Sequence, residues 1–256
     1  MKVSVIYGAL NRLEQAVNAK GETALYTYNG LGHRIGKTTG TMEKPGENHG
    51  TPQGMTVPDP LSTLEKQHIH PEKKIQYTID LTRSYHNLLQ KEEDGNTQSY
   101  LWDANVAGMT EDGQERYYLQ DEMGSPIRLL DEDGYLKDSY GYDEFGQDLY
   151  GNQGTIQPFG YTGYQADRIT GIYYAQAREY RAELGRFTAV DTINGFTAAP
   201  YTLNEYGYCW NNPIGLIDTD GLLPQWIVDI IDRYGGELPE WLERIIEGNE
   251  AHRLLQ

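Results

Sequence analysis

The stretch DEDGYLKDSYGYDEFG at Asp131–Gly146 sets the pattern on which much of the chain is built. It runs from a polar turn with Gly through a short segment and Tyr-x-Tyr to an Asp that leads into a second Gly. The stretch NAKGETALYTYNGLG at Asn18–Gly32 repeats this order with one residue fewer. Weaker copies occur at Glu92–Asp103 and Glu111–Gly124. Asp-Gly between alternating segments is a strong hairpin signal, so each copy predicts one β-hairpin.

The composition also favours β-structure. Tyr occurs 21 times and Gly 29 times in 256 residues, and Tyr favours strands while Gly favours the tight turns between them. A single hairpin is not stable alone, but stacked hairpins bury their Tyr faces against each other. We therefore predict a mainly β fold of stacked antiparallel β-hairpins with a short α-helical C-terminal tail. An ordinary β-sandwich is the alternative, although the repetition of Tyr-x-Tyr and Gly in one frame favours a repeating sheet.

Charge and cysteine content narrow the classes of function. The formal net charge is −17, whereas nucleic-acid binding needs a basic face, so we expect no nucleic-acid partner. Cys209 is the only cysteine, which leaves no intrachain disulfide and no cysteine-based zinc site. No stretch is long and apolar enough for a membrane span, and the first residues do not form a secretory signal.

One segment interrupts the repeats. Residues 41–74 are rich in Pro, Gly and charged side chains and lack a hydrophobic period, so we predict a flexible insertion there. His68 and His70 lie two residues apart within it. Without a third ligand nearby they predict no metal site. No motif calls for a cofactor.

The C-terminal tail, residues 223–256, shares none of the repeat pattern. Its Trp, Ile and Leu residues recur at helical spacing and predict two short helices with apolar stripes. The tail is either a helical hairpin packed on the β-body or a separate cargo. The chain thus divides into repeats at 1–40, the insertion at 41–74, hairpin repeats at 75–160, a core with two Asp motifs at 161–222 and the variable tail at 223–256.

Two stretches near the end of the β-region resemble a known family. YTGYQADRITGIYYAQAREYRAELGRFTAVDT at Tyr161–Thr192 and YTLNEYGYCWNNPIGLIDTDG at Tyr201–Gly221 resemble the core domain associated with RHS, or YD, repeat proteins. Tyr-Tyr, Gly-Arg-Phe, Tyr-x-Tyr and Asn-Asn-Pro occur in the family's order, and the hairpins upstream resemble its repeats. The resemblance implies a spiralling β-sheet shell that encloses a variable C-terminal polypeptide, usually a toxin.

The family's shells are larger than this chain, so the resemblance implies that these residues form the closing end of one. The implied partners are the chain's own C-terminal polypeptide, the rest of a larger RHS shell and an immunity protein. The resemblance also implies a bacterial protein that is secreted or associated with the cell surface.

In many members, two Asp motifs act as an intramolecular aspartyl protease that releases the C-terminal polypeptide. By resemblance, the motifs here are DTINGF at Asp191 and DTDGL at Asp218, and the cleaved bond is Leu222–Leu223. Both motifs have Thr where the family often has Pro. Two carboxyl groups suit hydrolysis by water, because one takes the water's proton and the other polarises the carbonyl. Held close together, they cannot both ionise easily, so one keeps a proton.

The resemblance implies supporting roles for three further residues. Arg186, in Gly-Arg-Phe, would be a structural or charge-balancing group, and Asp220 would serve the turn. Gly221 would let the backbone approach the attacked bond closely.

Other interpretations stay open at this point. Asp-x-Asp-Gly often makes only a turn, which would leave Asp218 without a catalytic role. The chain could be a non-enzymatic cell-surface or protein-interaction module that keeps only the repeat fold. A carboxylate-pair glycosidase would fit the acidity and the aromatic residues but lacks any motif. A calcium loop at Asp218 is not expected, because the neighbouring acidic ligands of such a loop are missing.

Overall fold

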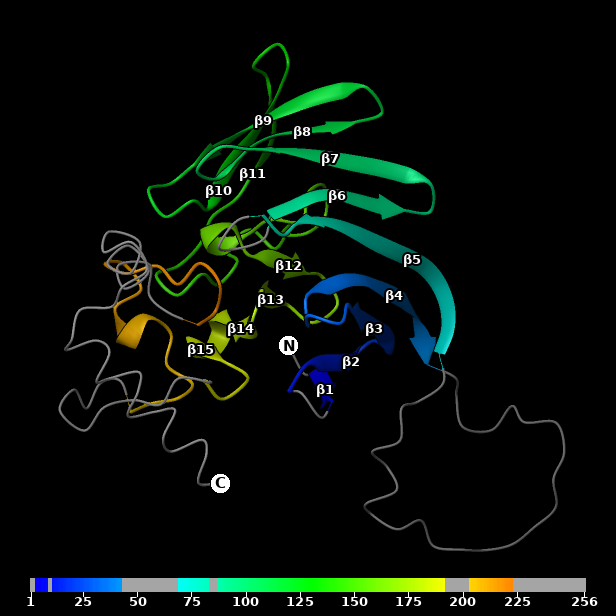
Figure 1. The fold of residues 1–256 in the computed structure, drawn as a ribbon. Coiled ribbons are helices and arrows are strands. Elements are labelled where there is room, and N and C mark those ends of the chain that lie inside the picture. Colours follow the sequence, from blue (N-terminus) through cyan, green and yellow to red (C-terminus); the bar gives the residue numbers. More distant parts are fainter. Residues whose placement is uncertain (1–2, 9–10, 43–68, 83–86, 192–202, 223–256) are drawn as a thin grey trace, which may run out of the picture.

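The computed structural model describes residues 3–8, 11–42, 69–82, 87–191 and 203–222 (Figure 1). These residues form two antiparallel sheets, one of eleven strands and one of four. The large sheet curves around the small one, which lies on its concave side (Figure 1). The prediction of a mainly β fold built from stacked antiparallel hairpins is confirmed.

In the large sheet each strand pairs with its neighbours in sequence, so the sheet is one continuous meander. Its strands are β1 (Val3–Tyr7), β2 (Leu13–Asn18), β3 (Glu22–Tyr28), β4 (Arg34–Met42), β5 (Ile69–Asp80), β6 (Asn87–Glu93), β7 (Asn96–Trp102), β8 (Val106–Glu111), β9 (Gln114–Gln120), β10 (Pro126–Asp131) and β11 (Leu136–Ser139). This order follows from the repeat, because each hairpin places the next strand beside the one before it.

A shared turn, here named the Asx–Gly turn, accounts for the Asn or Asp and the Gly of the repeat. The side-chain oxygen of its first residue accepts hydrogen bonds from the backbone N–H groups two and four residues later. The Gly three residues later has a positive φ, which Gly adopts without strain. Among the described residues, five turns have this form, and they begin at Asn18, Asn29, Asp121, Asp131 and Asp143. The acidic residues at these positions therefore serve the turns.

The small sheet is built around one fully buried tyrosine. Its strands are β12 (Gln165–Asp167), β13 (Ile172–Ala175), β14 (Arg178–Arg181) and β15 (Arg186–Phe187). Tyr180 of β14 is buried, and five aromatic rings lie with their centroids 4.5 to 6.3 Å from its own. These rings belong to Tyr161, Tyr164, Tyr173, Phe187 and Tyr208. Packed aromatic side chains of this kind contribute much of the core energy in a chain with few large aliphatic residues.

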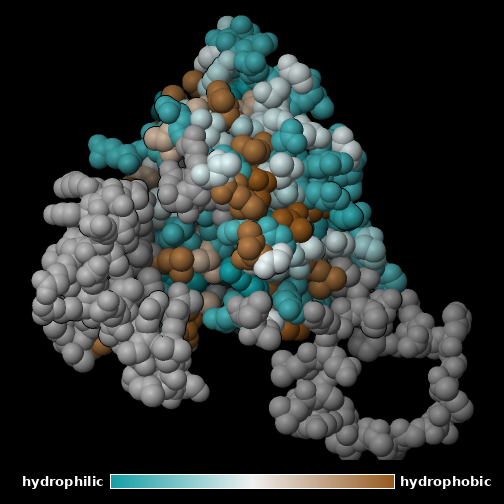
Figure 2. Space-filling view, in the orientation of Figure 1, coloured by the Kyte–Doolittle hydropathy of each residue, from teal (hydrophilic) through white to brown (hydrophobic). Residues whose placement is uncertain are grey.

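A second aromatic cluster joins the large sheet to the segment that leads into the small one. The ring of Phe159 makes edge-to-face contacts with Tyr100 at 4.9 Å and with Trp102 at 5.2 Å. Tyr100 is buried and its neighbour Leu101 is exposed, so β7 turns alternate side chains toward the concave face. Figure 2 shows apolar residues gathered near the middle of the molecule and hydrophilic residues along its upper and right margins.

The predicted bounds of the flexible insertion, residues 41 and 74, are wrong, because strands β4 and β5 extend into this range. β4 ends at Met42 and β5 begins at Ile69, and the two strands pair through these residues. Residues 70–74, in the first part of β5, are all exposed. Neither face of the strand is buried there, so its sequence shows no alternation of apolar and polar residues. Residues 43–68, including His68, lie outside the described residues, as do residues 223–256 with their predicted helices.

Candidate aspartate site

Asp191 and Asp218 are brought together around the guanidinium group of Arg178. Nη2 of Arg178 is 2.9 Å from Oδ2 of Asp191 and 3.7 Å from Oδ2 of Asp218. Both Oδ2 atoms therefore lie within 3.7 Å of the same nitrogen atom. The distance between the two Oδ2 atoms must then be less than twice 3.7 Å. Carboxyl groups that share one hydrolytic reaction in glycosidases lie about 5 to 9.5 Å apart. The two aspartates are close enough for joint chemistry.

Arg178 is fixed by several contacts at once. It begins β14, and its guanidinium carbon lies 3.7 Å from the ring centroid of Phe187 on β15. Its Nε donates a hydrogen bond to the backbone oxygen of Gly221, and its Nη1 donates to the backbone oxygen of Glu205 at 3.2 Å. The planar fork of arginine suits several acceptors together. Arg178 thus ties β14 to both segments that carry the aspartates.

Asp218 uses one carboxylate oxygen for a turn and the other for the ion pair. Its Oδ1 accepts hydrogen bonds from the backbone N–H groups of Gly221 at 2.7 Å and Leu222 at 3.1 Å. Gly221 has a φ of +76°, and the glycines of the Asx–Gly turns also have a positive φ. Its Oδ2 faces Arg178. Asp218 therefore takes part in a turn and also faces Arg178.

The surroundings favour different charge states for the two carboxyl groups. Asp218 is 2% exposed, and this burial raises the pKa of its carboxyl group well above the usual range, as do the neighbouring charges of Asp220 and Asp191. Arg178 opposes this rise in the pKa of Asp218. The side chain of Asp191 is more exposed, at 16%, and its 2.9 Å ion pair with Arg178 favours the ionised form. The site favours a proton on Asp218 and a negative charge on Asp191.

The backbone after Asp218 lies directly against the turn that precedes Arg178. A Cβ atom at Gly221 would lie 2.5 Å from the backbone oxygen of Ala175, so a larger residue does not fit without movement. The backbone oxygen of Asp220 accepts a hydrogen bond from the N–H of Ala177 at 2.9 Å. This close approach depends on glycine.

Leu222 is held by the same turn. Its backbone N–H lies 3.1 Å from Oδ1 of Asp218 and 2.9 Å from Oδ1 of Asp220. Leu223 lies outside the described residues, and with it the carboxyl side of the bond expected to be cleaved. The chain on the amino side of that bond is thus fixed beside the aspartates.

The charge-balancing role expected of Arg186 falls to Arg178. Arg186 lies on β15 with an exposed side chain and pairs with Arg181 of β14. Sequence reasoning missed Arg178, although it lies in the stretch that carries the family resemblance. The available signal was an arginine near two aspartate motifs, and three arginines, Arg178, Arg181 and Arg186, met that description. Only strand pairing decides between them, because it places Arg178 beside the Gly221 turn.

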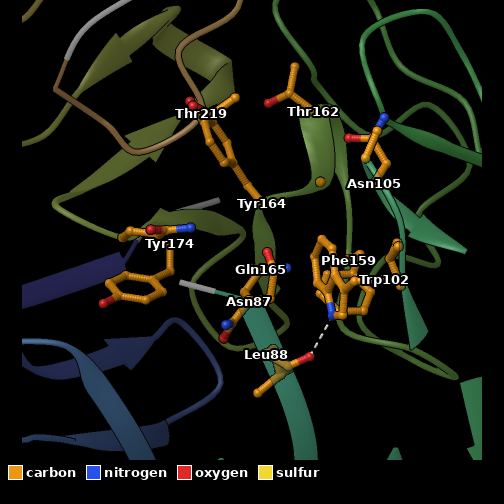
Figure 3. Close-up of a pocket in the computed structure, with 14 residues that line it drawn as sticks. Asn87, Leu88, Trp102, Asn105, Phe159, Thr162, Tyr164, Gln165, Tyr174 and Thr219 are labelled. Carbon is orange, nitrogen blue, oxygen red and sulfur yellow. Dashed lines mark hydrogen bonds between the residues drawn. The ribbon is translucent and has the colours of Figure 1, made fainter. Parts of the chain in front are cut away.

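A small cavity with polar and apolar lining residues adjoins the site (Figure 3). Its volume is about 60 Å³, and Thr219 and Tyr164 form part of its wall. The hydroxyl of Tyr164 donates a hydrogen bond to the backbone oxygen of Asp218. Two buried wall atoms, Oδ1 of Asn87 and Oγ1 of Thr162, have no hydrogen-bond partner among the described residues. A cavity needs about 10 to 15 Å³ for each water, so this one has room for a few.

The described part of the chain offers little to a metal ion. Within it, no group of three or more His, Cys, Asp or Glu side chains is arranged to hold one. Cys209 is buried there, and burial raises the pKa of its thiol. Among the same residues, no helix has both the length and the apolar character needed to cross a membrane.

Comparison with known proteins finds similar sequences. The Teneurin YD-shell family matches residues 76–214, more than half of the chain. The tRNA3(Ser)-specific nuclease WapA of Bacillus spizizenii is 26% identical over 271 residues, an alignment that covers 84% of this chain and 12% of WapA. Toxin protein Tse5 of Pseudomonas aeruginosa is 30% identical over 112 residues, with 44% of this chain and 8% of Tse5 covered. The chain spans about a tenth of the length of these relatives.

Solved structures give the same picture of the fold. The crystal structure of TcdB2-TccC3 matches with a TM-score of 0.56 and 20% identity, over 86% of this chain and 10% of that one. A Tc holotoxin pore of Photorhabdus luminescens matches with a TM-score of 0.55 and 20% identity, over 87% and 10%. At this identity the likeness shows the fold alone.

Proposed function

This chain belongs to the Teneurin YD-shell family, and on that premise we propose that it closes a larger YD-repeat shell and cuts its own backbone between Leu222 and Leu223. The family assignment confirms the resemblance to RHS and YD-repeat proteins. The rest of the shell joins at strand β1, which among the described residues pairs with β2 alone. The polypeptide that the shell presents and releases begins at Leu223.

One observation carries the proposal of self-cleavage. Two aspartates from separate segments meet at Arg178, and the turn of one of them holds Leu222. A purely structural turn needs only the Oδ1 of Asp218, as the Asx–Gly turns do. The small cavity at Thr219 adds room for water beside this turn.

In the proposed reaction, ionised Asp191 takes a proton from water, and the water oxygen adds to the carbonyl carbon of Leu222. Protonated Asp218 donates a hydrogen bond to the carbonyl oxygen and stabilises the negative charge that develops there. Asp191 then passes this proton to the nitrogen of Leu223, the bond between the Leu222 carbonyl carbon and that nitrogen breaks, and Leu222 ends in a carboxyl group while Leu223 becomes a new amino terminus. Arg178 keeps Asp191 charged and in place. The substrate belongs to the same chain, so proximity supplies much of the rate and one turnover suffices.

Intact-mass measurement of the purified full chain tests this proposal. We expect two products, one of which begins at Leu223. Asp191→Asn and Asp218→Asn should each leave the chain whole, because an amide cannot take or hold the required proton. Asn at position 218 still offers an oxygen to the N–H groups of the turn, so the loss would not follow from a broken turn.

A matched control distinguishes loss of the carboxyl group at the site from the effect of replacing an Asp that begins a turn. Asp143 begins an Asx–Gly turn, with its Oδ1 2.8 Å from the N–H of Gln147, outside the site. Asp143→Asn should be cleaved like the wild type. A wild-type chain that stays whole, or an Asp218→Asn chain that is still cut, would refute the proposed self-cleavage.

The firm anchoring of Arg178 supports a second candidate function. Its side chain is 4% exposed and contacts both aspartates and two backbone oxygens, which is also what a static clasp in a non-enzymatic interaction module requires. In that case the chain stays whole, and Asp191→Asn lowers the free energy of unfolding without changing the mass. Intact mass and unfolding together distinguish the two functions.

The location and further partners of the protein are part of the same proposal. We place it outside the cell or at the cell surface of a bacterium, with an immunity protein as the partner of the released tail. The description of one relative supports an exposed location: Salivary gland surface protein 1 of Aedes aegypti is 35% identical over 121 residues, which are 45% of this chain and 3% of that protein. Fractionation of the source cells tests it.

A further inference from the structure

The first hairpin of the chain reaches the aspartate site, and we infer that Arg12 is a positioning residue for it, an inference that rests on the proposed function. Arg12 lies in the turn between β1 and β2. Its Nη1 donates hydrogen bonds to the backbone oxygens of Gln176 at 3.3 Å and Ala177 at 3.2 Å. Ala177 directly precedes Arg178. A residue 165 positions earlier in the chain thus holds the segment that begins β14.

The turn that Arg12 contacts is strained. The N–H of Ala177 donates to the backbone oxygen of Ala175 at 2.8 Å, which closes a three-residue turn. Its central residue, Gln176, has a φ of +63°. Turns of this kind are rare, and they persist only where the surrounding structure holds them. A charged donor aimed at two carbonyl oxygens of the turn provides such a hold.

The same turn is in contact with the cleavage segment. The N–H of Ala177 also donates to the backbone oxygen of Asp220 at 2.9 Å. The backbone oxygen of Ala175 lies where a Cβ on Gly221 would collide with it, at 2.5 Å. A shift of the turn therefore moves Arg178 relative to both aspartates and disturbs the backbone beside the bond to be cut.

The hairpin makes a second contact with the residue that directly follows β15. The hydroxyl of Tyr7, on β1, donates a hydrogen bond to Oγ1 of Thr188 at 2.6 Å. The N–H of Thr188 in turn donates to the backbone oxygen of Glu179 at 2.8 Å. Thr188 lies three residues before Asp191. The hairpin thus touches the segments of Arg178 and of Asp191, and the site is complete only when the hairpin is seated.

Hydrogen exchange on the full chain tests the inference without relying on cleavage. In Arg12→Ala, the amides of Ala177, Gly221 and Leu222 should exchange about tenfold faster or more, because the held turn is released. Strand β13 should keep its protection. Lys20→Ala, an exposed cation at the next turn, is the matched control and should leave all these amides unchanged. Unchanged exchange in Arg12→Ala, or an equal rise along the whole chain, overturns the inference.

Cleavage kinetics give the second readout. If the wild type cuts itself, Arg12→Ala should slow the cut by about tenfold to a hundredfold, the usual effect of slight misplacement. Arg12→Lys should restore part of the rate, because lysine keeps the charge but loses the fork. Equal rates in wild type and Arg12→Ala would overturn the inference and leave the proposed function standing. An uncut wild type counts against the proposed function, and the exchange measurement then decides the inference alone.

Discussion

Arg34 of β4 and Glu179 of β14 form a buried ion pair between the large sheet and the small one. Their side chains are 3% and 6% exposed, and 145 positions separate them in the chain. The guanidinium carbon of Arg34 lies 4.3 Å from the ring centroid of Tyr26 and 4.1 Å from that of Tyr174. The large sheet thus holds the strand that begins with Arg178.

Breaking this pair should be costly. Arg34→Met leaves Glu179 buried without its cation, and we expect a loss of about 3 to 5 kcal/mol in the free energy of unfolding. Burial raises the pKa of Glu179, and Arg34 opposes that rise, so the variant should also favour a protonated Glu179. Urea unfolding at neutral pH measures the loss.

An exposed ion pair of the same sheet provides the control. Lys73 lies 2.9 Å from Glu93 but its side chain is 56% exposed, and such pairs contribute less than about 1 kcal/mol. Lys73→Met should therefore change stability little. Similar losses for Arg34→Met and Lys73→Met would show that burial does not set the strength of these pairs.

Gly221 should tolerate substitution less well than a repeat glycine. Gly134 has a φ of +83° and open space around its Cβ position, whereas Gly221 has a φ of +76° and the oxygen of Ala175 at 2.5 Å. Ala at either site costs about 1 to 2 kcal/mol for the backbone conformation. Gly221→Ala adds an overpacking cost of about 1 to 3 kcal/mol. Equal losses of stability for Gly134→Ala and Gly221→Ala in thermal unfolding would mean that the backbone at Gly221 is not in close contact with that of Ala175.

The raised pKa of Asp218 predicts a pH dependence of definite sign. Its folded-state pKa is raised by burial above the value near 3.9 of an unfolded chain, so the folded chain binds the extra proton. This contribution to stability is complete below about pH 4 and is lost as pH rises through the folded-state pKa. Asp218→Asn lacks the contribution. The stability of the wild type relative to this variant should therefore fall as pH rises from about 4 toward 8.

Paired urea titrations of wild type and Asp218→Asn across this range measure the effect. Glu179 also has a raised pKa, but it is present in both chains and cancels in the difference. A difference that stays constant with pH, or that grows in favour of the wild type, would show that Asp218 is ionised in the folded chain.

The hairpins could be predicted from the sequence because their signals are local. Asp94-Gly95 and Asp112-Gly113 have positive φ at both residues and form the turns β6–β7 and β8–β9, as Asp-Gly between alternating segments predicts. The start of β5 could not be predicted in this way. Its first residues are exposed, and pairing with β4 holds them in the strand. Pairing between segments that are distant in sequence produces no local hydrophobic pattern.

The residues of the aspartate site also differ in whether a local sequence signal identifies them. The resemblance named Asp191 and Asp218, because their motifs are short and local. Arg178 and Arg12 were not found, because each acts through contacts that exist only once strands distant in sequence lie side by side. Asp218 also shows why motif reading left two interpretations open. Its two carboxylate oxygens make different contacts, and the sequence does not distinguish them.

The coupling between Arg178 and the aspartates can be measured directly. Arg178→Met should cost about 3 to 5 kcal/mol, because it removes the buried guanidinium group that faces both carboxyl groups and donates to two backbone oxygens. The same substitution made together with Asp191→Asn and Asp218→Asn should cost less, since the charge that needs the arginine is gone. Unfolding of the four chains closes the cycle. Additivity within about 0.5 kcal/mol would mean that Arg178 does not act on the aspartates. Asp143→Asn, whose Oδ1 lies 2.8 Å from the N–H of Gln147 outside the site, should stay additive with Arg178→Met and serves as the control.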